Sequence, residues 1–320
     1  MQINRRAFVG ASVVAGAVAG SARAATESSR GSAAQRAALN TLSHYVEQHR
    51  ADWGLPGMTV CVVDRDGYTG FIRSGFAHLE DRTPVGAAHL FQIGSISKMM
   101  CALVVWQLVQ EGKLSLDAKL SALMPELRVD NGGDITLQHL LNHTAGLPDD
   151  APMQDALWSA WTPGLKWSYS NTGYEICGEI VARTDGRSYP EALAARLLTP
   201  LGMRETKAGI RVGDRMAYAQ GYEPPLNDRA NLRPGPRTQT PWIDTDFAAG
   251  CVASTAHDMA IFARFLIDMA QGKGGAVLRD DAAAQFIAVA VPAPGWAENA
   301  QYGNGIARIV DQDRHYWHHT

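Results

Sequence analysis

The stretch Phe91-Gln92-Ile93-Gly94-Ser95-Ile96-Ser97-Lys98 leads into an apolar run from Met99 to Val109. The glycine at position 112 is a typical helix end, so the sequence predicts a helix from Ser95 to Gly112. Ser95 and Lys98 stand three residues apart, which places their side chains on the same face of this helix. A serine hydroxyl must lose its proton before it attacks a carbonyl, and a partly desolvated lysine can take that proton.

The same spacing has a second interpretation, a helix-capping serine followed by a lysine in solvent. A further element favours chemistry: Trp167-Ser168-Tyr169-Ser170-Asn171-Thr172-Gly173, directly before another predicted helix. A phenol near a lysine ammonium is expected to have its pKa lowered below about 10, toward a proton-shuttling group. The amide of Asn171 can accept a hydrogen bond from an ammonium and donate one to a substrate carbonyl.

Outward from these elements, strands are predicted near both ends of the chain and helices between them. Met58–Asp64 and Tyr68–Phe76 form a predicted hairpin around an Asp-Gly turn. Gly303–Val310 and His315–Thr320 form a second pair. This order predicts an α+β fold, with an antiparallel sheet completed by distant segments, flanking helices and an inserted, mainly helical region.

The other predicted elements are a first helix, four later helices and one long loop. They are Ala34–Arg50, Leu137–Asn142 capped by Thr136, Thr172–Arg183 ending at Gly186, Ser188–Leu198, Thr255–Ala270, and the proline-rich loop Pro224–Thr245.

Two more motifs complete a resemblance to a known family. Leu140-Leu141-Asn142-His143-Thr144-Ala145-Gly146-Leu147-Pro148 lies between the two elements above, and Gly250-Cys251-Val252-Ala253-Ser254-Thr255 follows them. Taken together and in this order, the motifs resemble the serine β-lactamase and penicillin-binding protein family over about residues 36–320. The similarity is closest to its class C branch, which includes D-alanyl-D-alanine carboxypeptidases and serine esterases.

The resemblance implies a β-lactamase/transpeptidase-like fold, with a discontinuous sheet domain of residues 34–90 and 250–320. Residues 91–249 would form the mainly helical region, with the Ser95 helix at the interface. It also implies roles: Ser95 as the acylated nucleophile, Lys98 and Tyr169 as the proton relay, and Asn171 as a contact to substrate. The expected function is therefore a serine hydrolase acting on an amide, lactam or ester.

The family's third motif is Lys-Thr-Gly or His-x-Gly on a strand, and His319-Thr320 matches its first two positions. The resemblance makes both residues candidate substrate contacts. The glycine that should follow is absent, and with it the second oxyanion donor, whose loss typically costs about 3 kcal/mol. Family members also continue with further strands and a terminal helix, so we expect this sequence to be a C-terminally incomplete fragment.

Composition narrows the possible partners. The chain has 320 residues and a formal charge of -3, with interspersed charges, so the sequence does not favour a nucleic-acid partner. Four widely spaced cysteines indicate neither a disulfide framework nor a zinc site.

Residues 1–24 carry Arg5-Arg6, a short apolar run and Ala22-Arg23-Ala24, which resembles a twin-arginine export signal. The run is too short to span a bilayer, so we expect a periplasmic or secreted protein without stable membrane insertion.

Several alternatives stay open at this point. His143 could act as a triad base, although the Ala-Gly-Leu-Pro turn after it favours a structural loop. His315, His318 and His319 could suggest a metal, but no helical ligand pair or carboxylate accompanies them, and we predict no metal or cofactor. A non-hydrolytic penicillin-recognising or peptidoglycan-binding module is the main alternative function, and a protein that has lost its chemistry is the third. The sequence does not fix an oligomeric state.

Overall fold

The computed structural model describes residues 24–29, 31–153, 156–225, 235–312 and 314–319. The predicted export signal therefore lies outside the described residues, apart from Ala24, and so does Thr320. Contacts within the chain divide it into two units, which we describe separately. The first contains Met1–Phe91, Arg211–Ile243 and Thr255–Ala260, and the second contains Gln92–Ile210, Asp244–Ser254 and Ile261–Thr320. The domain boundaries proposed from the sequence stay a prediction.

The first unit is built on an antiparallel sheet of strand order β1-β3-β2, with β4 paired to β3. Its strands are β1 (Ala25–Ser28), β2 (Gly57–Val63), β3 (Thr69–His78) and β4 (Thr83–Pro84). The predicted hairpin is confirmed, since β2 pairs along its whole length with residues 69–75 of β3. In the turn, the Asp64 carboxylate accepts hydrogen bonds from the amides of Asp66 and Tyr68, and Gly67 takes a φ of 93° that favours glycine.

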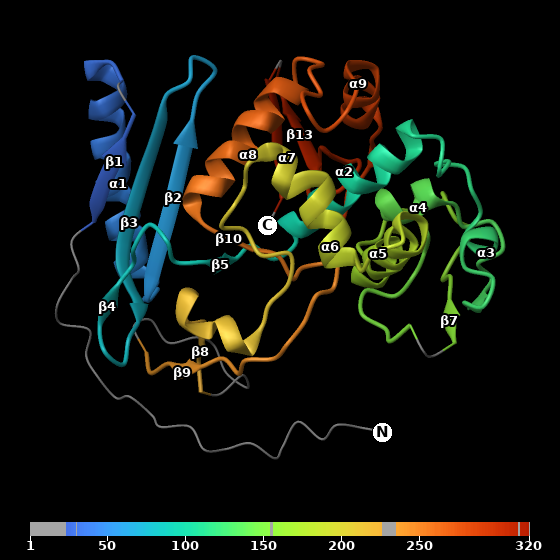
Figure 1. Cartoon of the computed structure of the whole chain (residues 1–320), viewed down its shortest axis with the longest axis horizontal. Helices are drawn as coiled ribbons and strands as arrows, with labels where there is room; N and C mark the ends of the chain where they lie inside the picture. Colours follow the sequence, from blue (N-terminus) through green and yellow to red (C-terminus); the bar gives the residue numbers. More distant parts are fainter. Residues whose placement is uncertain (1–23, 30, 154–155, 226–234, 313, 320) are drawn as a thin grey trace. The chain divides into compact units, whose positions relative to one another are not determined.

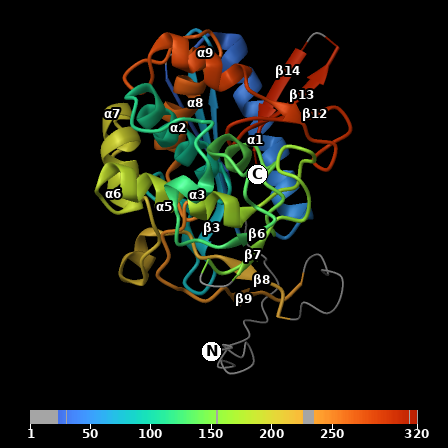
Figure 2. The same cartoon turned by 90° about the vertical axis from the view of Figure 1, so that its right-hand side faces the viewer.

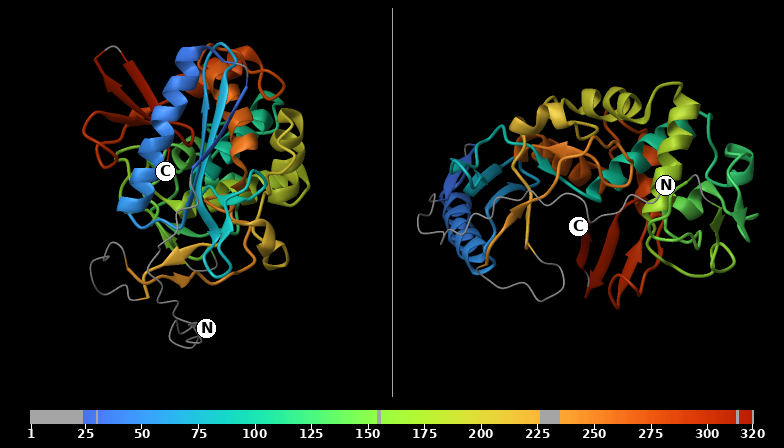
Figure 3. Two further views of the ribbon diagram at one scale, coloured as in Figure 1. Left: turned by 90° about the vertical axis from the view of Figure 1, so that its left-hand side faces the viewer. Right: turned by 90° about the horizontal axis from the view of Figure 1, so that it is seen from below.

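Helix α1 (Ala33–Asp52) packs along this sheet, as the left view of Figure 3 shows. Its first turn is closed by a capping box, in which Ser32 and Gln35 exchange hydrogen bonds. Leu39 and Val46 of the helix share a buried cluster with Ile72 of β3. The predicted first helix is confirmed to within two residues at each end.

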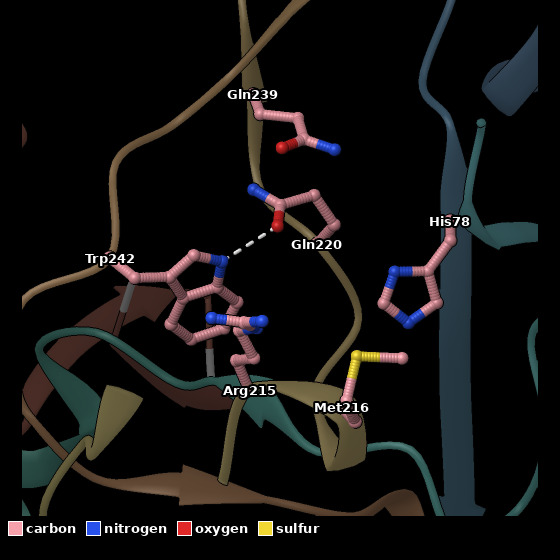
Figure 4. Close-up of a pocket in the computed structure, with 6 residues that line it drawn as sticks. All are labelled: His78, Arg215, Met216, Gln220, Gln239 and Trp242. Carbon is pink, nitrogen blue, oxygen red and sulfur yellow. Dashed lines mark hydrogen bonds between the residues drawn. The ribbon is translucent and has the colours of Figure 1, made fainter. Parts of the chain in front are cut away.

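The rest of the first unit includes a short 3₁₀ helix, η2 (Val212–Ala217), and the antiparallel pair β8 (Tyr222–Glu223) and β9 (Thr238–Gln239). The predicted loop from Pro224 to Thr245 is described only in part, because residues 226–234 lie outside the described residues. The indole Nε1 of Trp242 donates to the side-chain oxygen of Gln220 at 2.7 Å (Figure 4). Both side chains line a cavity of about 310 Å³, together with His78, Arg215, Met216 and Gln239.

The second unit contains α2 (Ile96–Gln110; Figure 1). Every residue of this helix from Ser97 to Leu108 is buried. A helix that is apolar on all sides belongs in a core rather than on a surface. It ends where Gly112 adopts a left-handed φ of 73°. The predicted helix from Ser95 to Gly112 is thus confirmed.

Helix α5 (Asn171–Asp185) packs against α2, and α4 (Leu137–Leu141) packs against α5. Thr136 caps α4 through its side chain, and Ser170 caps α5 by accepting from the amide of Gly173. Gly186 closes α5 in the left-handed conformation. Both helices were predicted, with ends that differ by one or two residues.

The helix that begins at Tyr189 runs further than predicted. It passes from α6 (Tyr189–Leu193) through a π-helical turn, η1 (Ala194–Leu198), into α7 (Thr199–Leu201). Pro200 has no amide hydrogen to donate to the carbonyl four residues earlier, that of Arg196. This carbonyl instead accepts from the side-chain amide of Gln107 at 2.8 Å. A tertiary contact therefore satisfies the group that the proline leaves free.

Strands near the end of the chain form an antiparallel sheet of order β11-β12-β13-β14 (Figure 2). They are β11 (Val291–Pro292), β12 (Ala300–Tyr302), β13 (Ala307–Asp311) and β14 (Arg314–His318). The predicted strand Gly303–Val310 begins only at Ala307. The preceding residues make a tight turn, in which the amide of Gly303 donates to the carbonyl of Ile306 and Gly305 has a φ of 75°.

Among the described residues, the strands from the two ends of the chain form separate sheets, not the single sheet expected from the sequence. The second sheet pairs only strands that follow one another in sequence, which short antiparallel turns favour, and in the first sheet β2–β3 and β3–β4 do the same while β1 pairs with β3. The predicted α+β class is nevertheless correct.

The remaining helices and strands are α3 (Leu120–Leu123), α8 (Ala256–Met269), α9 (Asp280–Ala288), β5 (Phe91–Gln92), β6 (Val129–Asp130), β7 (Leu157–Trp158) and β10 (Ala253–Ser254). In the described part of the chain, no helix has the length and apolar character needed to cross a membrane.

Gly305 links the second sheet to the start of α2, and its replacement provides a test of this packing. A Cβ at position 305 would lie 2.7 Å from backbone atoms of Met99, in addition to the strain of a positive φ. We expect Gly305→Ala to lower the free energy of unfolding by about 2–4 kcal/mol, since overpacking adds to the left-handed penalty.

Gly112→Ala is the matched control, because Gly112 has a similar φ of 73° but nothing within 4 Å of its would-be Cβ. It should cost only the left-handed penalty of about 1–2 kcal/mol. Urea denaturation measures both variants. Equal losses would contradict the close contact between Gly305 and α2.

Candidate active site

The first turn of α2 places Ser95 at the helix start with its hydroxyl uncommitted to capping. Its backbone is helical, with φ −68° and ψ −4°, and its side chain makes no capping hydrogen bond. The neighbouring Ser97 hydroxyl instead fixes this turn, donating to the carbonyl of Gly94 and accepting from the amide of Val252. The interpretation of Ser95 as an ordinary helix cap is therefore wrong.

Lys98 is fully buried, which also excludes the solvated lysine of that interpretation. Its Nζ donates to three oxygens: Ser95 Oγ at 3.0 Å, Asn171 Oδ1 at 2.6 Å and the carbonyl of Ala249 at 2.6 Å. Burial lowers the pKa of Lys98 to about 8, although the carboxylate of Asp149 partly opposes this shift. A substantial fraction of this amine is neutral at mildly alkaline pH.

The three contacts suit both protonation states of the amine. As an ammonium, Nζ has three hydrogens for three acceptor oxygens. As a neutral amine it keeps two hydrogens, which can stay on Asn171 and Ala249, and its lone pair then faces the hydroxyl of Ser95. The site can therefore hold a general base against the serine without rearranging.

Tyr169 approaches the same hydroxyl from the segment before α5. Its side chain lies beside that of Ser95, which acts to lower the pKa of the phenol, and Lys98 Nζ lies 4.8 Å from the centre of its ring. Burial raises the pKa of Tyr169 to about 12, with smaller contributions from Asp149 and Asp150. The expected decrease of this pKa below the ordinary value is thus wrong, because desolvation outweighs the lowering contribution of Ser95. At neutral pH the phenol is a proton donor.

Asn171 is the first residue of α5 and connects the lysine to two carboxylates. Its Oδ1 accepts from Lys98, while its Nδ2 donates to Asp149 Oδ1 and Asp150 Oδ1 at 3.2 Å each. Asp149 also accepts from the backbone amide of Asn171. Sequence reasoning missed both aspartates, although they directly follow the motif that ends at Pro148.

His319 lies near Tyr169, with their ring centres 6.2 Å apart, and its Nε2 is 2.9 Å from the hydroxyl of Tyr302. Trp296 also packs close to both rings, at 6.0 Å from Tyr169 and 5.2 Å from His319. Neither Trp296 nor Tyr302 was singled out as part of the site from the sequence. Thr320, the other predicted substrate contact, lies outside the described residues.

The second unit thus brings together five of the six predicted site residues. Of the neighbouring histidines, His318 accepts a hydrogen bond from the indole of Trp296 at 3.1 Å. Across the described ranges, no three histidine, cysteine, aspartate or glutamate side chains gather as a possible metal site.

Comparison with known proteins places this geometry in a family. The family model described as Beta-lactamase matches residues 42–320. A β-lactamase from Escherichia coli K12 is 28% identical over 69% of this chain and 58% of its own. Penicillin-binding protein 4 from Amycolatopsis lactamdurans is 30% identical over 68% of this chain and 61% of its own. The chain therefore spans about six tenths of the length of these relatives.

A solved structure with a similar fold supports the same family. The D-amino acid amidase of Ochrobactrum anthropi SV3, in complex with D-phenylalanine, superposes with a TM-score of 0.72 and 27% identity. The match covers 88% of this chain and 84% of the amidase. Since the family model covers most of the sequence and the fold agrees, the chain belongs to the beta-lactamase family.

Proposed function

We propose that the protein is a serine hydrolase that forms an acyl-enzyme on Ser95 with an amide, lactam or ester substrate. The observation that carries this proposal is the fully buried amine of Lys98, held 3.0 Å from the Ser95 hydroxyl oxygen. A buried lysine is costly unless it is paired, and here its partners include a hydroxyl that needs a base. The similar proteins described above are named β-lactamase, penicillin-binding protein and D-amino acid amidase. All three names fit a serine hydrolase of amides or lactams.

In the acylation step, neutral Lys98 takes the proton of Ser95 while the serine oxygen bonds to the substrate carbonyl carbon. The carbonyl oxygen becomes negative, and the backbone amide of Ser95 is available to it. That amide has no hydrogen-bond partner among the described residues. When the intermediate collapses, the bond to the leaving nitrogen or oxygen breaks. Tyr169, protonated at neutral pH, gives this atom a proton and is reprotonated by Lys98.

Water then completes the reaction. It attacks the acyl carbon with its proton passing to the same relay, and Ser95 leaves as a hydroxyl once more. The products are a carboxylic acid and an amine or alcohol. Asn171 is proposed to hold both Lys98 and the substrate, and His319 to contact a carboxylate or the developing oxyanion. Histidine is mostly neutral near pH 7, so it binds carboxylates less firmly than lysine. We therefore favour ester or peptide substrates over efficient β-lactam turnover.

Export to the periplasm or the cell exterior is a further proposal, supported by the pattern of residues 1–24.

Covalent labelling tests the nucleophile. A fluorescent penicillin or a fluorophosphonate should label the protein, and Ser95→Ala should abolish both the label and p-nitrophenyl ester hydrolysis. Ser168→Ala is the matched control, because Ser168 is a serine of the same site motif as Tyr169 but has no proposed part in the reaction. Ligand binding that survives in Ser95→Ala, without labelling of the parent protein, would instead indicate a non-hydrolytic module.

The pKa of Lys98 sets the pH dependence. Acylation needs the neutral amine, so its rate should rise tenfold per pH unit below about 8 and level off above it. Lys98→Ala should slow acylation by about 10²–10⁴-fold and remove this rise. Stopped-flow acylation between pH 5 and 10 provides the measurement. In Tyr169→Phe the pH dependence of the acylation rate should keep its midpoint near 8, because Lys98 is unchanged. If this midpoint disappears in Tyr169→Phe, the titrating group is the phenol.

Cell fractionation tests export. Replacing both Arg5 and Arg6 by lysine should leave an uncleaved precursor in the cytoplasm, because twin-arginine signals are read through their arginine pair. Arg23→Lys, close to the predicted cleavage site, should be exported normally. Unchanged export of the Arg5/Arg6 double variant would rule out this route.

A further inference from the structure

Tyr169 lies in a segment that has no secondary structure of its own. Residues 167–170 belong to no helix or strand, and α5 begins only at Asn171. A phenol that exchanges protons with Ser95 must be held within a fraction of an ångström, since misplacement by about 1 Å can cost a hundredfold in rate. Contacts from elsewhere in the chain must therefore provide this precision.

His143 provides two such contacts, one on each side of Tyr169. Its backbone carbonyl accepts from the amide of Ser168 at 2.9 Å, and its Nδ1 accepts from the amide of Ser170 at 3.1 Å. Its imidazole ring also packs on the phenol ring, with centres 4.4 Å apart. A single residue thus contacts the side chain of Tyr169 and both adjoining backbone amides.

The backbone of His143 is strained in a way that fits this role. Its φ is 61°, in the left-handed region that non-glycine residues rarely adopt. Such outliers persist where surrounding structure holds them, and they gather at functional sites. The following loop continues the same support, because the carbonyl of Pro148 accepts from the hydroxyl of Ser170 at 2.7 Å.

The imidazole is arranged as an acceptor rather than as a base. Nδ1 is occupied by the Ser170 amide, so the ring hydrogen of the neutral form lies on Nε2. That atom is buried and has no hydrogen-bond partner among the described residues. Burial, with Lys98 and His319 nearby, holds the pKa of His143 well below its usual value. The triad-base interpretation fails, since neither nitrogen is open to take a proton from Ser95.

We propose that His143 is a positioning residue, which fixes the phenol of Tyr169 against Ser95 by binding the two backbone amides that flank it. The inference rests on the proposed function of Tyr169 as a proton donor. It assigns to the His-Thr-Ala-Gly-Leu-Pro loop a direct part in the geometry of the proton relay.

Two variants that tolerate a left-handed φ separate the acceptor from the backbone conformation. His143→Asn keeps an oxygen at the place of Nδ1, and asparagine accepts positive φ more readily than most residues. His143→Gly accepts the conformation and keeps the backbone carbonyl that binds the Ser168 amide, but it removes the Nδ1 acceptor of the Ser170 amide. His139→Ala is the matched control, because His139 lies in the preceding helix and its Nδ1 accepts from Thr136, far from the two amides of interest in sequence.

We expect His143→Gly to lower the acylation rate constant about a hundredfold, with little change in the binding constant of the labelling substrate. His143→Asn should recover most of that loss, and His139→Ala should stay within about threefold of the parent protein. Stopped-flow labelling gives both constants, and thermal unfolding reports the folded fraction. Equal rates in the parent protein and His143→Gly, or no recovery in His143→Asn, would overturn the proposal.

A second readout does not depend on activity. In the parent protein, ¹⁵N spectroscopy should show an unprotonated His143 Nδ1 coupled to the Ser170 amide, and hydrogen exchange should show that amide protected. Protection should fall in His143→Gly and persist in His143→Asn. If the parent protein is never acylated, the proposed function fails. The spectra and the hydrogen exchange still test the contact between the Ser170 amide and His143 Nδ1. A protonated Nδ1 would overturn the inference whatever the activity and even if His143→Gly did not fold.

Discussion

The desolvation of a single amine is the constraint on which the rest of the site depends. Lys98 is removed from water by the apolar body of α2, and three oxygens replace its hydration. Removing a charge from water is unfavourable unless hydrogen bonds compensate, so these three contacts stabilise the fold and prepare the base together. Burial lowers the pKa of Lys98 to about 8, so part of the amine is neutral near that pH. The neutral amine faces the hydroxyl of Ser95.

Each of the three oxygens comes from a different part of the second unit. Ser95 belongs to the start of α2, Asn171 to the start of α5, and the Ala249 carbonyl to the segment before β10. Helix starts are suitable places for such groups, because their first residues carry unpaired amides and well-defined side-chain directions. The lysine therefore acts as a tertiary link as well as a base, and the loop from His143 to Asp149 holds the tyrosine and asparagine that surround it.

Much of this arrangement follows from sequence patterns, and some of it cannot. Helical spacing alone places Lys98 one turn after Ser95, and the predicted helix Thr172–Arg183 places Tyr169 just before the start of α5. The carbonyl of Ala249 has no sequence signature, since every residue has a carbonyl. The pKa of Tyr169 was predicted with the wrong sign because residue types indicate a nearby charge, whereas burial depends on packing between distant segments. The separate pairing of the two sheets was missed for the same reason.

The most direct test of the account is the titration of Lys98 itself in the free protein. NMR of protein labelled with ¹³C at lysine Cε, with Lys98 assigned from a Lys98→Arg variant, follows its charge between pH 6 and 11. If Lys98 is the proposed base, its midpoint lies near 8. A midpoint at the ordinary lysine value of about 10.4 would show a solvated ammonium, and the proposed base would be lost with it.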